Sequence, residues 1–365
     1  MIDVVPGALG PFGWSERVHA LFCEHALAGA ERSPLPAGHP PAGRAPQGPD
    51  HATPARIVRV ERTRCFAIFP DGHERPVVAG TLPAVGDWVV ARDGALVAAL
   101  PRWSELTRIG PDAAGPGTQV LAANIDTVFI AVPGDRLNPA RAERELAVAW
   151  DSGAEPIVVL TKSDLAPVGG VRRLMARLVG ATIVEASART GQGLADITRA
   201  LAGYKTAVLL GPSGAGKSTL VNALLGSDAM AVGQVRDDDG RGRHTTSRRQ
   251  LVPVPGGGVL IDTPGLRSLG LAGDVSTDKA FADIAALAQQ CQFGDCRHDR
   301  EPGCAVNEAV QNGTLDKDRL GNFAKLEGEI EADRRRYDPR AGQEHQRAWK
   351  QRAKQGQANR RSKQG

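Results

Sequence analysis

The sequence predicts a multidomain protein with an N-terminal five-stranded β-barrel, a central α/β domain and a C-terminal, mainly helical, metal-binding domain. Three observations predict this fold class. Five short alternating runs lie between residues 57 and 100, strongly apolar runs alternate with helical stretches after residue 124, and three cysteines and a histidine crowd into residues 291–304. We place the boundaries as follows: a disordered or Pro-rich extension at 1–54, the barrel at 55–111, the α/β domain at 112–275, the metal-binding domain at 276–335 and a basic tail at 336–365.

Composition excludes several protein classes. Of the 365 residues, 41% are hydrophobic and 24% charged, close to the globular average, which argues against wholesale disorder and against collagen-like or coiled-coil chains. No run of about 18 apolar residues is present, and the first residues make a poor signal peptide. We therefore expect a cytoplasmic protein that does not enter a membrane and that is monomeric.

Charge is distributed unevenly along the chain. Residues 331–365 carry a net charge of +7, whereas the whole chain carries only +4, so the rest of the chain is slightly acidic. A basic tail of this kind is either an arm that binds nucleic acid or a solvated terminus that favours solubility.

The barrel is predicted from five runs between residues 55 and 111 that are separated by turn signals such as Asp71-Gly72. Five short strands in under 60 residues fit an OB-fold, although any small barrel or sandwich gives the same pattern. The preceding stretch contains prolines throughout residues 34–54 and is predicted to be a linker or a disordered extension.

In the α/β domain, apolar runs at 127–132, 156–160, 206–210 and 258–261 alternate with helical stretches. This alternation is typical of a parallel sheet with helices on its faces, so a functional site is expected at the carboxyl ends of the strands.

A phosphate-binding loop follows the run at 206–210. Its nine residues fit the pattern G-x-x-x-x-G-K-[ST] and are Gly211, Pro212, Ser213, Gly214, Ala215, Gly216, Lys217, Ser218 and Thr219. Backbone N–H groups and a helix N-terminus would face the phosphates, Lys217 would reach the β- and γ-phosphates, and Ser218 would bind Mg²⁺.

A guanine-reading segment follows the run at 156–160. The carboxylate of Asp164 in Thr161-Lys162-Ser163-Asp164 can accept two hydrogen bonds from guanine, whereas adenine offers an acceptor at one of those positions. Lys162 would lie along the base, and Ser187-Ala188, after the run at 181–184, would complete the base site. Alone, the tetrapeptide could equally be an ordinary turn.

Two further segments are predicted to respond to the γ-phosphate. Asp262, at the end of the run at 258–261, is placed to hold the Mg²⁺ shell, and the N–H of Gly265 to contact the γ-phosphate. Thr245 and Thr246 lie in a loop that would supply one threonine to Mg²⁺, and we favour Thr246; a plain surface loop is the alternative.

The order of these segments is circularly permuted relative to an ordinary GTPase, because base reading precedes the phosphate loop and γ-phosphate sensing comes last. Nucleotide binding depends only on where the loops lie at the sheet edge, so geometry permits this order.

With these motifs in place, the chain resembles the RsgA (YjeQ or YloQ) family of circularly permuted GTPases that depend on the small ribosomal subunit. The resemblance covers residues 55 to about 330 and leaves out the first 54. It is carried by the motif order and by these segments: 85–89, 123–126, 242–246, 262–267 and 291–306. It implies an OB-fold, a GTPase domain and a zinc domain, with GTP, Mg²⁺ and one structural Zn²⁺. It further implies action on the small ribosomal subunit and its rRNA late in assembly, with other assembly factors as candidate partners. Thr161 departs from the Asn that most GTPases have there.

Catalysis needs a residue other than the glutamine that ordinary GTPases place after the sensing glycine, because that position is Leu266. His244 is the candidate, and the resemblance implies the same; a solvated loop histidine is the alternative. We then expect slow hydrolysis that the subunit stimulates and that is coupled to release. A P-loop ATPase or kinase with an RNA-binding appendage is the competing function.

The metal ligands are predicted to be Cys291, Cys296, His298 and Cys304, a closed set of three thiolates and one imidazole of the kind that Zn²⁺ uses structurally. Three of the five cysteines would then bind the metal, and the other two, Cys23 and Cys65, would be unpaired thiols, which accounts for the odd number.

Overall fold

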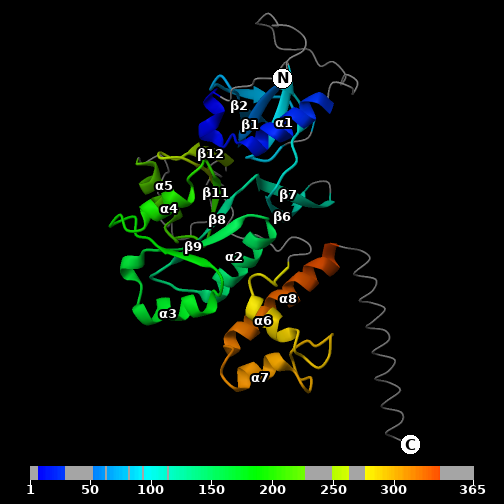
Figure 1. Ribbon diagram of the computed structural model, residues 1–365, viewed down its shortest axis with the longest axis vertical. Helices are drawn as coiled ribbons and strands as arrows, with labels where there is room; N and C mark the ends of the chain where they lie inside the picture. Colours follow the sequence, from blue (N-terminus) through cyan, green and yellow to red (C-terminus); the bar gives the residue numbers. More distant parts are fainter. Residues whose placement is uncertain are drawn as a thin grey trace, which may run out of the picture. The chain divides into compact units, whose positions relative to one another are not determined.

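A computed structural model describes residues 7–28, 52–61, 64–80, 83–92, 94–112, 115–226, 249–262 and 276–337 (Figure 1). The chain divides into two compact units. The first comprises Met1–Thr107 and Val120–Ser268, and the second comprises Arg108–Gln119 and Leu269–Gly365.

The first unit contains the parallel sheet that the sequence predicts. Its strand order is β10-β9-β8-β11-β13, with β12 antiparallel at the β13 side. The strands are β8 (Thr127–Pro133), β9 (Glu155–Thr161), β10 (Thr182–Glu185), β11 (Thr206–Leu210), β12 (Arg249–Pro253) and β13 (Val259–Asp262). Every residue of β8 and β11 is buried, as expected for strands covered on both faces.

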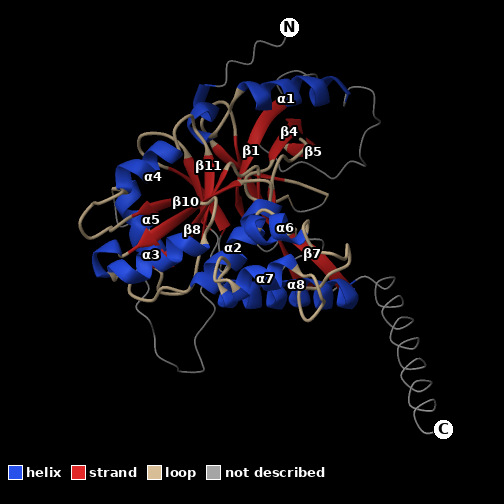
Figure 2. Ribbon diagram, turned by 60° about the horizontal axis from the view of Figure 1, so that its bottom comes forward, coloured by secondary structure: helices blue, strands red, loops and turns tan. Residues whose placement is uncertain are grey.

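Helices connect the parallel strands and pack beside them (Figure 2). They are α2 (Pro139–Asp151), the 3₁₀ turn η3 (Ser163–Leu165), α3 (Val168–Arg177), α4 (Leu194–Ala200) and α5 (Lys217–Leu225). The start of α2 shows how sequence sets a boundary. Asn138 caps the helix by accepting a hydrogen bond from the Arg141 N–H at 3.0 Å, and Pro139 occupies the first helical position, where no N–H is needed. On one face, Ile197 of α4 and Leu220 of α5 pack against Phe129 of β8.

Five strands form the expected β-rich domain: β1 (Thr53–Val60), β2 (Cys65–Ile68), β3 (Glu74–Val77), β4 (Trp88–Arg92) and β5 (Ala95–Ala99). They are ordered β3-β2-β1-β4-β5, and a parallel bridge between Val78 and Ala95 joins the two outer strands. β1 also pairs with β12, so both domains share one 11-stranded sheet.

The N-terminal segment differs from the expectation of a disordered extension over residues 1–54. Gly7–Phe12 form the 3₁₀ helix η1 and Glu16–Ala28 form α1, and Leu9, Val18 and Phe22 are fully buried. For these residues the expectation is wrong, because three apolar side chains at irregular spacing pack onto the fold although no long periodic run announces them. The Pro-rich residues 34–49 lie outside the described residues.

A long hairpin between the barrel and the parallel sheet was not expected either. It consists of β6 (Glu105–Asp112) and β7 (Gly115–Ala123). The boundary expected between residues 111 and 112 lies inside β6, since the strand continues to its last residue, Asp112.

The second unit contains the expected mainly helical domain, with α6 (Ala282–Ala288), α7 (Ala305–Gln311) and α8 (Lys317–Tyr337). Its core includes Phe281, and Arg319, which is 2% exposed, bonds to both Asp283 carboxylate oxygens at 2.8 and 2.7 Å. Among the described helices, none combines the length and the apolar character needed to cross a membrane. Residues 338–365 of the basic tail lie outside the described residues.

Candidate functional site

The phosphate-loop sequence lies between β11 and α5, as predicted, and its backbone requires glycine. Gly211 has a φ of +137°, and a Cβ there would lie 2.6 Å from the Ala131 carbonyl oxygen. Gly216, at the start of α5, has a φ of +80°. The Lys217 ammonium donates to the carbonyl oxygens of Gly211 and Pro212, each at 2.7 Å. The lysine is therefore folded over the loop whose N–H groups would hold phosphates.

Thr161 ties this loop to the end of β9. Its hydroxyl, on a residue 4% exposed, donates to the Ala215 carbonyl oxygen at 2.6 Å and lies 3.4 Å from the Val132 carbonyl oxygen. Thr161 therefore joins the predicted base-reading segment to the phosphate-loop sequence by a hydrogen bond.

Asp164 meets its predicted partner at the end of the next strand. Its Oδ1 accepts from the Ser187 hydroxyl at 2.7 Å, and its Oδ2 accepts from the Arg189 guanidinium at 2.8 and 3.1 Å. These bonds, that of Ser187 first and that of Arg189 second, hold the pKa of the Asp164 carboxyl below its usual value. The half-buried Ala188 lies between the two donors. An ionised carboxylate only accepts, which suits it to the two N–H groups of guanine.

Lys162 adopts a left-handed backbone with a φ of +52°, and its ammonium pairs with the Asp135 carboxylate at 2.8 Å. Its side chain runs beside the phosphate loop, because a Cβ at Gly216 would lie 4.0 Å from its Cε. The hydrogen bond from Lys162 lowers the pKa of Asp135.

Sequence reasoning missed three residues at this site: Asp135, Arg136 and Arg189. Arg136 is exposed, and its Nη2 would lie 3.0 Å from a Cβ at Gly214, which places a cation beside the phosphate loop. A signal for the first two was present, since they follow the buried strand β8, whose carboxyl end lies at the same sheet edge as those of β9 and β11.

Only some of the other predicted site residues lie within the described part of the chain. The backbone of Asp262 ends β13, beside β11 in the sheet. Ser218 and Thr219 lie in the first turn of α5. His244, Thr245, Thr246 and Gly265 lie outside the described residues.

The four predicted metal ligands come together in the second unit. The Sγ atoms of Cys291, Cys296 and Cys304 and a ring nitrogen of His298 all lie within 4.8 Å of one another. His298 Nδ1 is 3.6 Å from the Cys291 sulfur and 3.4 Å from the Cys304 sulfur, and those sulfurs are 3.9 Å apart. A tetrahedral zinc with Zn–S near 2.3 Å requires about 3.8 Å between sulfurs and about 3.6 Å from sulfur to nitrogen. The donor set therefore fits zinc, which His298 would bind through Nδ1.

The start of α7 supports this cluster. Burial acts to raise the pKa of the Cys291 thiol, but the backbone N–H groups of Val306 and Ala305 outweigh it and hold the pKa below its usual value. Cys304 is the N-cap of α7 and accepts from the Asn307 N–H at 3.4 Å. The helix start thus favours the thiolate of Cys291, the form in which cysteine binds metal, whereas burial and the neighbouring sulfurs raise the pKa of Cys296 to about 11.

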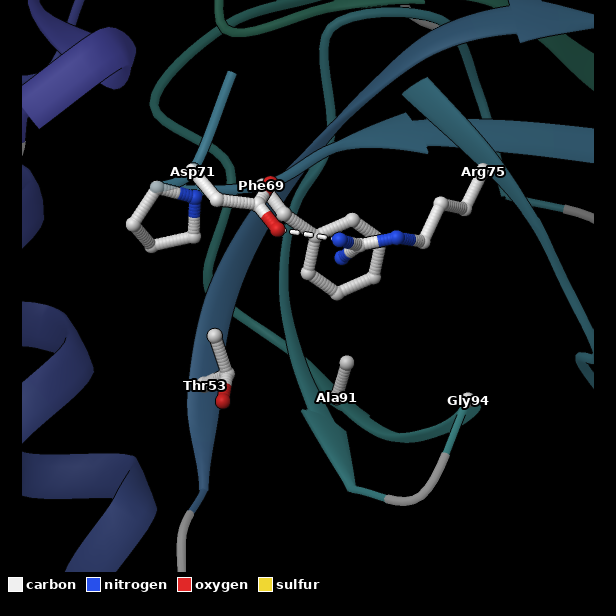
Figure 3. A pocket seen from close by; sticks show the side chains of 7 residues that line it. Thr53, Phe69, Asp71, Arg75, Ala91 and Gly94 are labelled. Carbon is white, nitrogen blue, oxygen red and sulfur yellow. Dashed lines mark hydrogen bonds and ion pairs between the residues drawn. The ribbon is translucent and has the colours of Figure 1, made fainter. Parts of the chain in front are cut away.

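A groove of about 310 Å³ lies on the five-stranded β-rich domain, and its lining includes Thr53, Phe69 and Ala91 (Figure 3). Arg75 forms an ion pair with Asp71 there, and its guanidinium lies over the Phe69 ring, 5.0 Å from the ring centre. Both charges are already paired and Phe69 is buried, so this groove offers no free stacking face.

Known proteins resemble this chain along most of its length. A family model described as RsgA GTPase matches residues 99–272. The small ribosomal subunit biogenesis GTPase RsgA of Streptomyces coelicolor is 44% identical over 340 residues, covering 88% of this chain and 92% of that protein. A protein of Lactiplantibacillus plantarum with that name, numbered 2, is 44% identical over 294 residues, covering 75% of this chain and 82% of its own. The Streptomyces match is longer than residues 55–365, so similarity reaches into the N-terminal segment that the sequence resemblance left out.

Two solved structures share the fold. YjeQ from Thermotoga maritima aligns with a TM-score of 0.58 at 24% identity, covering 77% of this chain and 99% of that one. YloQ, described as a circularly permuted GTPase, aligns with a TM-score of 0.56 at 22% identity, covering 80% and 99%. The permuted order of base-reading, phosphate-loop and sensing segments, the meeting of Asp164 with Ser187, and these matches lead to one conclusion: the chain belongs to the RsgA GTPase family.

Proposed function

We propose that this protein binds the maturing small ribosomal subunit in its GTP form, hydrolyses GTP when the subunit stimulates it, and is then released. The observation that carries the proposal is the ionised Asp164 carboxylate, held by Ser187 at the same sheet edge as the phosphate loop. The subunit as partner rests on relatives that are named small ribosomal subunit biogenesis GTPases. A protein with this role works where ribosomes are assembled, in the cytoplasm.

The nucleotide is GTP rather than ATP in this proposal. Asp164 would accept from both N–H groups of guanine, and Lys162, fixed by Asp135, would lie along the base. Gly211 through Thr219 would hold the phosphates, and Ser218 with Thr246 would hold Mg²⁺. His244 would orient the attacking water. An ATPase or kinase is the alternative, and competition of ATP against labelled GTP separates the two.

The other domains would bind the subunit. Strand pairing supports an OB-type barrel, because β1 pairs with both β2 and β4 while the bridge from Val78 to Ala95 closes the ring in parallel. The metal-binding unit and the basic tail would add contacts to rRNA. If the tail neutralises phosphates, removing residues 338–365 lowers the salt dependence of subunit binding; an unchanged dependence assigns the tail to solubility.

The deciding experiment measures GTP turnover by the full chain with and without purified small subunits, with large subunits as the control. We expect slow turnover alone and a clear increase with small subunits only. No increase would refute the ribosomal role and leave the GTPase intact. Equal increases with both subunits would refute selectivity for the small one. Asp164→Asn, assayed with xanthosine triphosphate, checks that turnover belongs to this site.

A further inference from the structure

A buried arginine lies where the barrel meets the parallel sheet. Arg56, on β1, is 1% exposed and is enclosed on all sides. Its Nη2 donates to the Thr206 hydroxyl at 2.8 Å, its Nε donates to the Gly86 carbonyl oxygen at 3.3 Å, and its guanidinium lies 4.9 Å from the centre of the Trp88 ring. Burial lowers its pKa to about 10, still far above neutral pH, so a full charge is held inside the protein.

Two segments meet around this charge. Both contribute to the resemblance to the family, but neither contains a predicted catalytic, nucleotide-binding or metal-binding residue. They are residues 85–89 of the barrel and residues 123–126, which lead into β8. Gly86 has a φ of +95°, and a Cβ there would lie 2.1 Å from the Ala123 carbonyl oxygen, so only glycine allows this approach. Asn124 donates from its side chain to the Gly86 carbonyl oxygen at 3.0 Å, and its own carbonyl oxygen lies 3.5 Å from Arg56 Nη2.

The N-terminal segment closes the third side. The Phe12 carbonyl oxygen accepts from Arg56 Nη1, and a Cβ at Gly13 would lie 2.6 Å from the same nitrogen. Trp14 packs edge-on against Trp88, with ring centres 5.4 Å apart. We call the set Phe12, Trp14, Arg56, Trp88 and Thr206 the Arg56 joint.

Thr206 gives this joint a direct connection to the nucleotide site. It is the first residue of β11, whose last residue, Leu210, directly precedes Gly211 of the phosphate loop. Its backbone is fixed as well, because its N–H donates to the Asp126 carboxylate at 2.7 Å. The Arg56 guanidinium contacts the first residue of β11, and the loop predicted to bind phosphate follows the last. Only the five buried residues of this strand therefore lie between them.

We propose that Arg56 is a positioning residue that makes the barrel and the phosphate-loop strand open and close as one unit, with Gly7–Ala28 as the clamp that completes it. Opening the barrel away from β11 would break the hydrogen bond from Arg56 to Thr206 and the close contacts that pack around the guanidinium, which is costly. A nucleotide that stabilises the phosphate loop then also stabilises the barrel. This inference goes beyond the proposed function and requires only that the phosphate loop bind GDP.

Amide hydrogen exchange of the full chain, with and without GDP and Mg²⁺, tests this coupling. At a GDP concentration of about one hundred times Kd, amides that exchange only through the shared opening slow about one hundredfold. In the wild type we expect this slowing both in β11 and in β1 and β4 of the barrel. The slowing in β11 reports GDP binding by itself, so a failure to bind nucleotide is recognised separately from a failure of coupling.

Thr206→Val is the test variant, because it removes the hydroxyl that accepts from Arg56 and keeps a β-branched residue in the strand. Thr127→Val is the matched control. Thr127 lies on the adjacent strand β8 and is equally buried at 1%, but within the described structure its hydroxyl has no hydrogen-bond partner. We expect Thr206→Val to keep the slowing in β11 and to lose most of it in β1 and β4, down to less than about tenfold, while Thr127→Val behaves as the wild type.

Trp14→Ala tests the clamp separately, since it removes the contact with Trp88 and leaves β11 untouched. It too should reduce the slowing in β1 and β4 but not in β11. Three results would each overturn the role of Arg56. In the wild type, GDP could slow amide exchange in the parallel sheet but not in the barrel. Alternatively, Thr206→Val could keep the full slowing in β1 and β4, or Thr127→Val could lose as much of it as Thr206→Val. Full barrel slowing in Trp14→Ala would overturn the role of the N-terminal segment.

Discussion

Thr161→Val should weaken nucleotide binding, folding or both, because it removes a buried hydrogen bond to the phosphate loop. The hydroxyl donates to the Ala215 carbonyl oxygen at 2.6 Å from a residue that is 4% exposed. Val keeps the shape and suits a strand, so the change removes one buried hydrogen bond and leaves a carbonyl in the phosphate loop without its side-chain donor. A lost bond of this kind costs about 1–2 kcal/mol. If the whole loss of free energy appeared as weaker nucleotide binding, the Kd for GDP would rise about 5- to 30-fold.

Two measurements divide this cost between folding and binding. Urea unfolding without nucleotide should show a lower midpoint with an unchanged slope, and a titration with fluorescent GDP should show a higher Kd. The two losses together should come to about 1–2 kcal/mol. Thr127→Val again serves as the control, since its hydroxyl has no partner to lose. If Thr161→Val unfolds at the wild-type midpoint and binds GDP with the wild-type Kd, the bond to Ala215 does not support the phosphate loop.

Three other predictions concern the base site, the metal and catalysis. Asp164→Asn should weaken GDP binding by more than about a hundredfold and favour xanthosine diphosphate, measured by competition titration; unchanged GDP affinity would remove the carboxylate from base reading. Cys304→Ser should reduce bound zinc from one equivalent to almost none, measured by metal analysis, although serine still caps α7, so retained zinc would exclude Cys304 as a ligand. His244→Ala should lower subunit-stimulated GTP turnover much more than basal turnover, and equal losses, or none, would argue against its role.

The sequence alone predicts a candidate site best where a short segment carries its own chemistry. The loop from Gly211 to Thr219 contains the glycines that its backbone needs and a lysine at the required spacing, and the structure has the strand and helix on either side. That the four candidate metal ligands come together could be predicted for the same reason, since Cys291 and Cys304 bracket one short window and the fold only has to close it.

Pairs that depend on which strand lies beside which were not predictable. Asp135 can pair with Lys162 only because β8 and β9 are neighbours in the sheet. Arg189 can pair with Asp164 only because the turn after β10 brings the two side chains together. The N-terminal segment was missed for a related reason. Phe22 is buried and the half-buried Trp14 packs against Trp88 of another part of the chain, so their own sequence has neither a clear helical period nor a motif.

The parallel sheet is joined to the β-rich domain and, along the chain, to the second unit. The β-rich domain is joined to it in two ways: Arg56 donates to Thr206 at the amino end of β11, the strand that leads into the phosphate-loop sequence, and β1 pairs with β12, which in turn pairs with β13. The chain leaves the sheet after Asp262, where the γ-phosphate is expected to be sensed, and the second unit begins seven residues later at Leu269. In an unpermuted GTPase that sensing segment would lead back into the sheet. Here it leads into the second unit, so we expect GTP and GDP to differ in their effect on that unit.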